Sequence, residues 1–230
     1  MTGPEPHGYG VALRTLTSGL AHEVRNPINA ARLQLELLDR RLRRELDEAR
    51  FRDPVAAVMT ELERLTRLLD DFLAFAEPTA LRLEDLDLVA ALREGCEHEQ
   101  ALADKLGVRL ELTASEPTVP ARVDRAKILG LLRYLVRNAL EVTPRGTTVT
   151  VGVQVSDDRQ EVILEVTDFG SGIAARDRAR IYEPFFTTKD TGTGLGMAIA
   201  LGIVTQHRGS IRFESSTAGT RFHVRLPRCP

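Results

Sequence analysis

The chain has 230 residues, of which 43% are hydrophobic and 28% are charged, so it can bury the core of one or two globular domains. Its 31 basic and 33 acidic residues nearly balance, which argues against nucleic acid as a partner. No apolar run approaches the roughly 20 residues that span a bilayer, and the two cysteines lack the spacing of a metal site. We therefore expect a cytoplasmic chain without membrane contact of its own, with any sensor or membrane segment outside it.

The N-terminal part of the chain predicts a flexible lead followed by two helices. Residues 1–10 are rich in glycine and proline. From residue 11 to about Leu42, apolar residues recur every three or four positions, which predicts an amphipathic helix. A second run, from Val55 to Ala76, has the alternating spacing of a coiled-coil seam and follows a polar turn near residues 47–54. These patterns predict an antiparallel helical hairpin over residues 11–77.

A single hairpin would leave both of its apolar stripes half exposed. Two copies that pack into a four-helix bundle would bury them, so we predict a homodimer. The alternative is that both helices pack on the domain that follows in the same chain.

The sequence Glu77-Pro78-Thr79-Ala80 ends the second helix, because proline donates no amide hydrogen and restricts the residue before it. We expect a linker over residues 78–84 and a second domain over residues 85–230. Its alternating elements predict an α/β sandwich with one sheet face covered, and an α+β chain overall. The expected helices are 88–105, 124–142 and 195–207, and the expected strands are 108–113, 121–123, 148–155, 161–167, 210–214 and 220–226.

The segment from Ser18 to Pro27 (SGLAHEVRNP) contains a candidate phosphoryl acceptor. His22 lies off the apolar stripe and so faces water. Its imidazole is nucleophilic when neutral near pH 7, and Glu23 can orient it or accept its proton as a new bond forms. Asn26 lies one helical turn further on the same face, and the proline predicts a kink beside the acceptor. A lone exposed histidine is usually only a solvated residue, but these neighbours favour chemistry.

Two further segments predict a site for a nucleotide. Asn138, in the expected helix 124–142, offers a side-chain oxygen to the Mg²⁺ ion of a metal triphosphate. Asp168 ends an expected strand, so its carboxylate can accept a hydrogen bond from the exocyclic amine of adenine. Gly170 and Gly172 would let the backbone approach the flat base. The alternatives are a solvated helical asparagine and an ordinary turn after a strand.

A glycine-rich segment predicts where the phosphates bind. Gly192, Gly194, Leu195 and Gly196 lie at the start of the expected helix 195–207, where free backbone amides would face an anion. This is not a Walker loop, because no Gly-Lys-Ser/Thr follows, and no strand directly precedes it as in a dinucleotide fingerprint.

The segment of residues 181–190 (IYEPFFTTKD) has no clear period and predicts a mobile lid. Phe185 and Phe186 can dock against the helical bundle or the nucleotide site when this lid closes. The alternative is that both rings fill a local apolar pocket. Lys189 and Thr188 are candidates to reach a phosphate.

The chain resembles the transmitter module of bacterial two-component sensor histidine kinases, and the similarity covers nearly all of it. The matching motifs, in chain order, are His22-Glu23-Val24-Arg25-Asn26-Pro27, Asn138, Asp168 with Gly170 and Gly172, Glu183-Pro184-Phe185-Phe186, Gly192 with Gly194 and Gly196, and Gly219-Thr220. The resemblance implies a dimeric helical domain joined to an ATP-binding domain of the Bergerat type. It further implies ATP and Mg²⁺ as cofactors, with Asn138 as metal ligand and Thr220 near adenine.

The resemblance also implies a reaction, in which a phosphoryl group passes from ATP to His22 and then to an aspartate in the receiver domain of a response regulator. Glu23 would assist His22, and Asn26 would position water if the protein also dephosphorylates its regulator. Tyr134 departs from the family, which often has a second asparagine one helical turn before Asn138.

Two other classes of protein share parts of this pattern. An ATP-driven clamp or chaperone has the same nucleotide fold, but the His22 segment argues against it. A docking module with a decayed nucleotide site is the second alternative, and the intact Asn138, Asp168 and glycine residues argue against that one.

Overall fold

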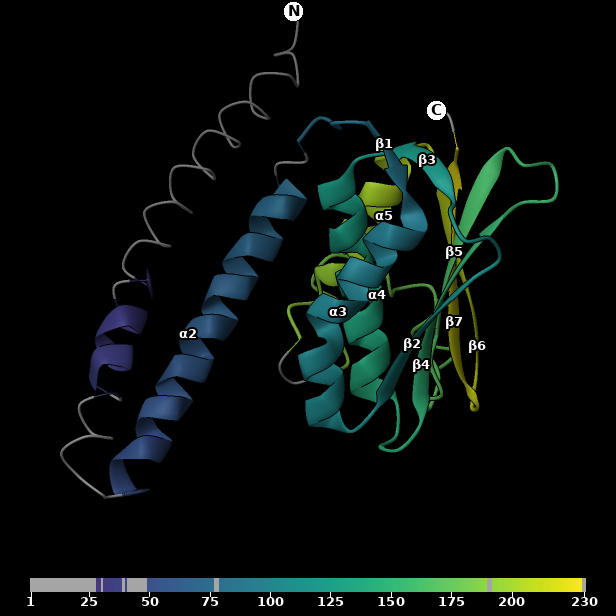
Figure 1. Cartoon of the computed structure of the whole chain (residues 1–230). Helices are drawn as coiled ribbons and strands as arrows, with labels where there is room; N and C mark the ends of the chain where they lie inside the picture. Colours follow the sequence, from purple (N-terminus) through teal and green to yellow (C-terminus); the bar gives the residue numbers. More distant parts are fainter. Residues whose placement is uncertain are drawn as a thin grey trace, which may run out of the picture. The chain divides into compact units, whose positions relative to one another are not determined.

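A computed structural model describes residues 28–29, 31–38, 40, 49–76, 79–189 and 192–228, and for residues 49–54 it describes the backbone alone. The chain divides into two compact units, Met1–Thr79 and Ala80–Pro230 (Figure 1). The predicted N-terminal lead and the segment with His22, Glu23 and Asn26 lie outside the described residues. The domain limits given above stay a prediction.

The first unit is helical where it is described. Residues 28–29, 31–38 and 40 are helical, and α2 spans Ala49–Ala76. Val55 is buried, whereas Val58 and Leu65 of the same apolar stripe are 48% and 40% exposed. One copy of the chain therefore covers only part of this stripe. Among the described residues, no helix combines the length and the apolar character needed to cross a membrane.

Residues 49–54 of the turn predicted near 47–54 are helical, because α2 already begins at Ala49. Proline in a helix removes the hydrogen bond to the carbonyl four residues before it, here that of residue 50. Since Pro54 lies near the start of a 28-residue helix, the rest of the hydrogen-bond ladder is unaffected.

The second unit is built on a five-stranded mixed sheet. Its strand order is β2-β4-β5-β7-β6, with β2 parallel to β4 and the other neighbours antiparallel. The strands are β2 (Arg109–Ala114), β4 (Thr148–Val155), β5 (Glu161–Thr167), β6 (Ser210–Ser216) and β7 (Gly219–Pro227). The strands predicted from the sequence are all present, with ends that differ by up to two residues.

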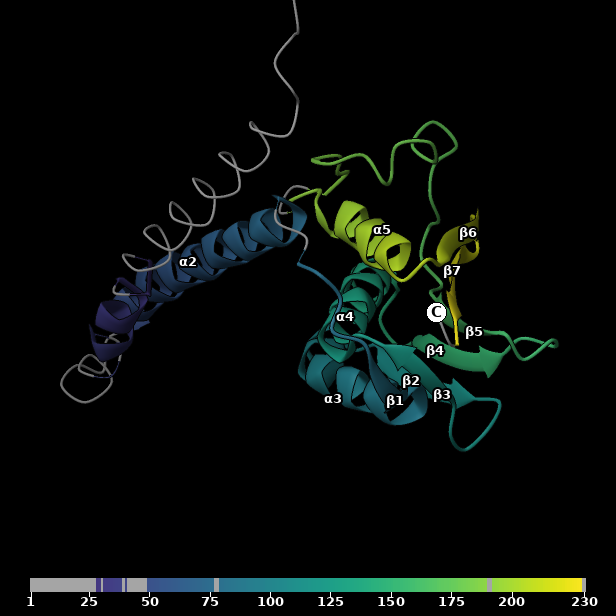
Figure 2. The same ribbon diagram turned by 90° about the horizontal axis from the view of Figure 1, so that it is seen from above.

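Three helices cover one face of this sheet, which confirms the predicted sandwich (Figures 1 and 2). They are α3 (Leu88–Leu106), α4 (Arg125–Val142) and α5 (Gly196–Gln206). Burial along β4 and β5 alternates residue by residue, because successive side chains of a strand point to opposite faces. The side chains of the helix-covered face form the core together with Leu92, Leu131 and Val204.

A short strand, β1 (Glu84–Asp87), lies at the end of the predicted linker and pairs antiparallel with β3 (Pro120–Val123). Its sequence, EDLD, has low β propensity, so composition gave no sign of a strand. Asp87 explains why the chain turns there, because its Oδ1 accepts hydrogen bonds from the amides of Val89 and Val119. One carboxylate thus caps α3 and fixes the entry to β3.

Asp124 has a similar role at the start of α4. Its Oδ1 accepts from the amide of Lys127 and its Oδ2 from the amide of Arg82. Its own amide donates to Nε2 of the buried His207 at 3.1 Å. These bonds join the linker, α4 and the end of α5. The buried His207 therefore has a structural role.

Cys96 is a core residue of α3, and burial raises the pKa of its thiol to about 11. A thiol with such a pKa stays protonated and is a poor nucleophile and metal ligand near neutral pH. Cys96 therefore contributes to this unit as a core residue.

Candidate nucleotide-binding site

Asp168 and Thr220 form a buried pair at the ends of β5 and β7. Both residues are 5% exposed. Oδ1 of Asp168 accepts hydrogen bonds from the amides of Gly170, at 2.8 Å, and Thr220, at 3.1 Å. Within the described residues both of these bonds end on Oδ1, so Oδ2 is the oxygen that can accept from a ligand. The two residues that the sequence predicts for adenine recognition are therefore in direct contact, although 52 positions separate them.

Burial raises the pKa of Asp168, whereas the hydrogen bonds from Gly170 and Thr220 and the charge of Lys189 lower it by less. The net direction is upward because desolvation penalises the charged form. A carboxylate that is buried yet held by two backbone amides is a defined acceptor for an amine donor. This is the chemistry expected of a residue that reads the amino group of adenine.

Gly170 and Gly172 pack against other parts of the protein. The sequence instead predicts that they let the backbone approach the base. A Cβ atom at Gly170 would meet Val142 at the end of α4, and one at Gly172 would overlap the carbonyl oxygen of Ser216. Gly172 also has a φ of 74°, in the left-handed region. These glycines thus let two segments of the protein approach each other, and they shape the site through that packing.

Replacing Gly172 with alanine is expected to destabilise the second unit by at least about 2 kcal/mol, since the new Cβ overlaps the carbonyl oxygen of Ser216 and alanine is strained at this left-handed φ. Urea unfolding followed by circular dichroism measures this change. Gly202→Ala is the matched control, because Gly202 lies in α5 and an added Cβ there would have no atom of another part of the protein within 4 Å. Alanine there should leave stability equal or higher. Equal stability of the two variants would contradict the packing described for Gly172.

The predicted phosphate segment opens α5. The first residue of this helix is Gly196, and no side chain caps its N-terminus. The first amides of a helix have no partner within it, so they are available to an anion. The side chain of Leu195 is fully buried, so only its backbone can contribute to ligand binding. Gly194 has a φ of 69° and lies against the backbone of Phe185.

The predicted lid is irregular in structure but is attached to the sheet. Residues 174–189 form turns and bends. The ring of Tyr182 packs on Phe213 of β6 with centroids 6.4 Å apart. Arg178 donates to the carbonyl oxygens of Ile173 and Ser215. Phe186 lies under the guanidinium of Arg180, at 4.3 Å, whereas Phe185 is 64% exposed. Phe186 therefore packs against a residue that lies just before the predicted lid.

Lys189, at the end of this segment, reaches α4. Its Nζ donates to Oδ1 of Asn138 at 3.1 Å and lies 2.5 Å from Oε2 of Glu141. Asn138 and Glu141 are three positions apart on the helix, so their side chains are neighbours on one face. The predicted metal ligand and the predicted phosphate-reaching lysine are thus in contact.

One face of α4 gathers the predicted motifs. Tyr134 lies against Gly196 at the start of α5, Asn138 binds Lys189, and Val142 lies against Gly170. These three residues of α4 are spaced by four, which places them on successive turns of the same face. Residues from three distant parts of the sequence therefore meet along a single helix. This convergence is the geometry expected of one ligand site.

The donors on this face suit Mg²⁺, which prefers oxygen ligands and retains several waters. Asn138 offers an amide oxygen and Glu141 a carboxylate. In the described part of the chain, no group of three or more histidine, cysteine or acidic side chains can enclose a metal ion. A cation here would therefore take its remaining ligands from phosphate oxygens and water.

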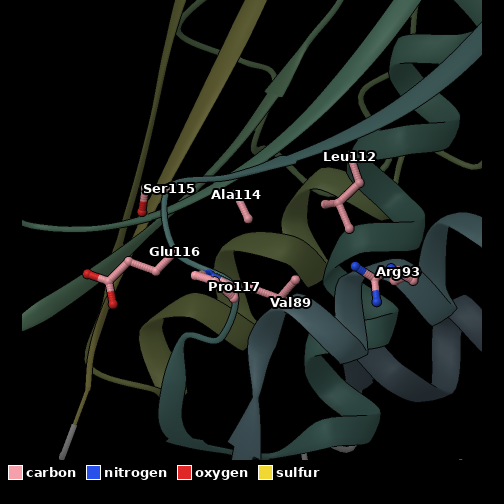
Figure 3. Close-up of a pocket in the computed structure, with 7 residues that line it drawn as sticks. All are labelled: Val89, Arg93, Leu112, Ala114, Ser115, Glu116 and Pro117. Carbon is pink, nitrogen blue, oxygen red and sulfur yellow. The ribbon is translucent and has the colours of Figure 1, made fainter.

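A separate pocket of about 370 Å³ lies between α3 and the segment that follows β2 (Figure 3). Val89 and Arg93 line it from α3, and Leu112 and residues 114–117 line it from the other side. None of the predicted nucleotide residues contributes to this pocket. Its location does not support a role in the chemistry predicted for the chain.

Sequence reasoning missed Ser215 and the partners of Lys189. Oγ of Ser215 accepts from the amide of Ile173 at 2.7 Å and lies 3.0 Å from Oγ1 of Thr220. It therefore supports both the Asp168 segment and Thr220. A serine in a short strand carries no local signal of this role, since its partners are 42 and 5 positions away.

Comparisons with known proteins identify two domains in the chain. Residues 12–81 match the family model of the His Kinase A (phospho-acceptor) domain, and residues 123–230 match that of the histidine kinase-, DNA gyrase B-, and HSP90-like ATPase. Sporulation kinase E of Bacillus subtilis (strain 168) is 30% identical over 92% of this chain and 28% of its own length. Sensor histidine kinase ZraS of Escherichia coli (strain K12) is 32% identical over 94% of this chain and 46% of its own length.

Solved structures show the same fold. Full-length ShkA in complex with AMPPNP has a TM-score of 0.78 and 27% identity, over 93% of this chain and 45% of that one. Histidine kinase ThkA in complex with response regulator protein TrrA has a TM-score of 0.67 and 24% identity, over 93% and 61% of the two chains. The chain spans less than half the length of the two curated relatives.

The two family models identify a phosphoacceptor domain followed by an ATP-binding domain of the kinase, gyrase B and HSP90 type. The chain belongs to the two-component sensor histidine kinases and forms a transmitter module of that family. The phosphoacceptor domain favours this class over the ATP-driven clamp considered from the sequence.

Proposed function

We propose that this chain is the catalytic core of a protein-histidine kinase, which phosphorylates its own His22 with Mg²⁺-ATP and passes the phosphoryl group to a response regulator. The observation that carries the proposal is the meeting of three predicted motifs along one face of α4, at Tyr134, Asn138 and Val142. A decayed docking module would not need this arrangement. The family match at residues 12–81 supplies the acceptor domain.

In the proposed site, each part of the nucleotide has its own partner. Oδ2 of Asp168 accepts from the amino group of adenine, next to the buried Thr220. The free amides at the start of α5, with Gly192 and Gly194 before them, bind phosphate oxygens. Oδ1 of Asn138 would hold the Mg²⁺ ion, which when bound neutralises charge on the phosphates.

The transfer itself forms one bond and breaks one. A ring nitrogen of His22 attacks the γ-phosphorus, a nitrogen–phosphorus bond forms, and the bond from the γ-phosphorus to the bridging oxygen breaks with its electrons on ADP. Glu23 accepts the ring proton that the new bond makes acidic. In the second step a regulator aspartate attacks the same phosphorus and His22 leaves. Catalysis of this kind depends mostly on positioning and charge neutralisation.

The partners follow from the same chemistry. Phosphohistidine is a phosphoryl donor, and an aspartate in a receiver domain of a response regulator is the acceptor that we propose. ThkA, which shares the fold, was solved in complex with response regulator protein TrrA. Regulator phosphatase activity, with water positioned by Asn26, belongs to this proposal as a second activity of the same helix.

We further propose that the chain acts as a homodimer. In α2, the apolar side chains of Val58, Leu65, Leu68 and Phe75 are between 38% and 48% exposed. A second copy that packs against this helix would remove them from water, as in a four-helix bundle. A His Kinase A domain at these residues agrees with that arrangement.

Incubation of the chain with Mg²⁺ and γ-labelled ATP tests the kinase proposal. The protein should acquire a label that acid removes and alkali leaves in place, because the nitrogen–phosphorus bond of phosphohistidine is acid-labile. Asn138→Ala should weaken both nucleotide binding and labelling. Release of labelled phosphate without labelled protein, or an acid-stable label, would contradict the proposal.

A further inference from the structure

The contact between Lys189 and Asn138 has a consequence for the metal. The ammonium lies 3.1 Å from Oδ1 of Asn138, the oxygen proposed to bind Mg²⁺, and 2.5 Å from Oε2 of Glu141. Asn138 is half-buried, and the side chain of Lys189 is only 32% exposed. Solvent therefore screens this group less than it screens a lysine on an open surface.

The ammonium and a divalent cation compete for this oxygen. A Mg²⁺ ion binds oxygen at about 2.1 Å, so on Oδ1 it would lie within about 5 Å of the present position of Nζ. Two positive charges at that separation, in a partly buried site, repel each other. Binding of the metal at Asn138 therefore favours withdrawal of the Lys189 ammonium.

The backbone of Lys189 is fixed next to the phosphate segment, so withdrawal needs only the side chain to move. Its amide donates to Oγ1 of Thr187 at 3.1 Å, and its carbonyl oxygen accepts from the amide of Gly192 at 3.2 Å. The backbone of the lysine thus stays next to Gly192 of the predicted phosphate segment whether or not its side chain contacts Asn138. When no metal is bound, the ammonium of Lys189 would neutralise part of the negative charge of the nucleotide phosphates.

We propose that Lys189 is a specificity-determining residue, which competes with the divalent cation for Asn138 and so sets how strongly nucleotide binding depends on the metal. This inference rests on the proposed function of Asn138 as a metal ligand. Glu141 supports the competition, because its carboxylate holds the ammonium on the same face of α4. Loss of the lysine should weaken metal-free binding and leave metal-dependent binding equal or tighter.

Calorimetry on the full chain tests this, with a non-hydrolysable ATP analogue titrated in excess Mg²⁺ and again in EDTA. The measured quantity is the ratio of the dissociation constant in EDTA to that in Mg²⁺. Lys189→Met should raise this ratio at least about fivefold, a coupling of ordinary size between two ligands. Lys189→Arg keeps the charge and should stay close to the wild-type ratio. Lys105→Met, an exposed lysine at the end of α3, is the matched control and should also leave it unchanged.

The outcomes separate this inference from the function on which it rests. If Lys189→Met changes both dissociation constants by the same factor, the lysine is an ordinary phosphate contact and the inference is wrong. If the wild-type chain binds no nucleotide, or if Asn138→Ala leaves the ratio unchanged, the proposed site itself is wrong. A raised ratio in Lys189→Met, together with a wild-type ratio in Lys189→Arg, supports the competition.

Discussion

Replacing His22 with glutamine is expected to reduce labelling by γ-labelled ATP to background, while the affinity for nucleotide changes by less than about twofold. Glutamine keeps the size and polarity of the side chain but has no nucleophilic ring nitrogen. The nucleotide contacts that we propose all belong to the second unit, so they should not depend on this residue. Labelling followed by autoradiography, and calorimetry with a non-hydrolysable analogue, measure the two effects.

His98→Gln is the matched control for this experiment, because His98 is an exposed histidine of α3. This variant should label like the wild type. Persistent acid-labile label in the His22 variant would show that another of the five histidines is the acceptor. That result would leave the proposed nucleotide site unaffected, but it would contradict the role of the His22 segment as phosphoryl acceptor.

Asp168→Asn is expected to weaken nucleotide binding by about ten- to a hundredfold, which corresponds to the roughly 1.5–3 kcal/mol of a hydrogen bond to a charged group. The asparagine Oδ1 can still accept from the amides of Gly170 and Thr220, so the local fold should be kept. Its amide nitrogen, however, replaces Oδ2, the oxygen that we propose accepts from adenine, so two hydrogen-bond donors then face each other. Calorimetry with a non-hydrolysable ATP analogue measures the loss.

The raised pKa of Asp168 adds a pH dependence to this prediction. As the pH falls through that raised value, the carboxylate gains a proton and its affinity for the adenine amine should fall, at a higher pH than for an ordinary aspartate. Stability responds in the opposite direction. A carboxyl whose pKa is raised by folding contributes most to stability below its unfolded pKa, and this contribution is lost as the pH rises through the folded pKa.

The Asp168→Asn variant should lack the acid-side loss of affinity that we expect of the wild-type chain. Asp157→Asn is the control, since Asp157 lies exposed between β4 and β5. It should bind nucleotide like the wild type at every pH. An Asp168→Asn variant that keeps full affinity and the wild-type pH profile would exclude Asp168 as the adenine partner.

Most elements of the second unit could be predicted from local patterns. The expected helix 124–142 corresponds to α4, since its apolar spacing is regular and Asp124 is a good capping residue. The strand β1 could not be predicted, because its EDLD sequence favours a loop and only its pairing with β3 makes it a strand. The start of α2 before Pro54 was likewise hidden, since a proline there suggests a boundary.

The sequence by itself determined which residue types are present and in what order: a candidate nucleophile on a helix, an acid at the end of a strand, and glycines before a helix. Those features depend on neighbours in the chain, so local periodicity and spacing reveal them. Only the tertiary structure decided that the amide of Thr220 donates to Asp168, that Gly170 packs against Val142, and that Nζ of Lys189 donates to Asn138. Such contacts join residues that are 28 to 52 positions apart, and packing of the sheet and helices, which no local pattern encodes, brings them together.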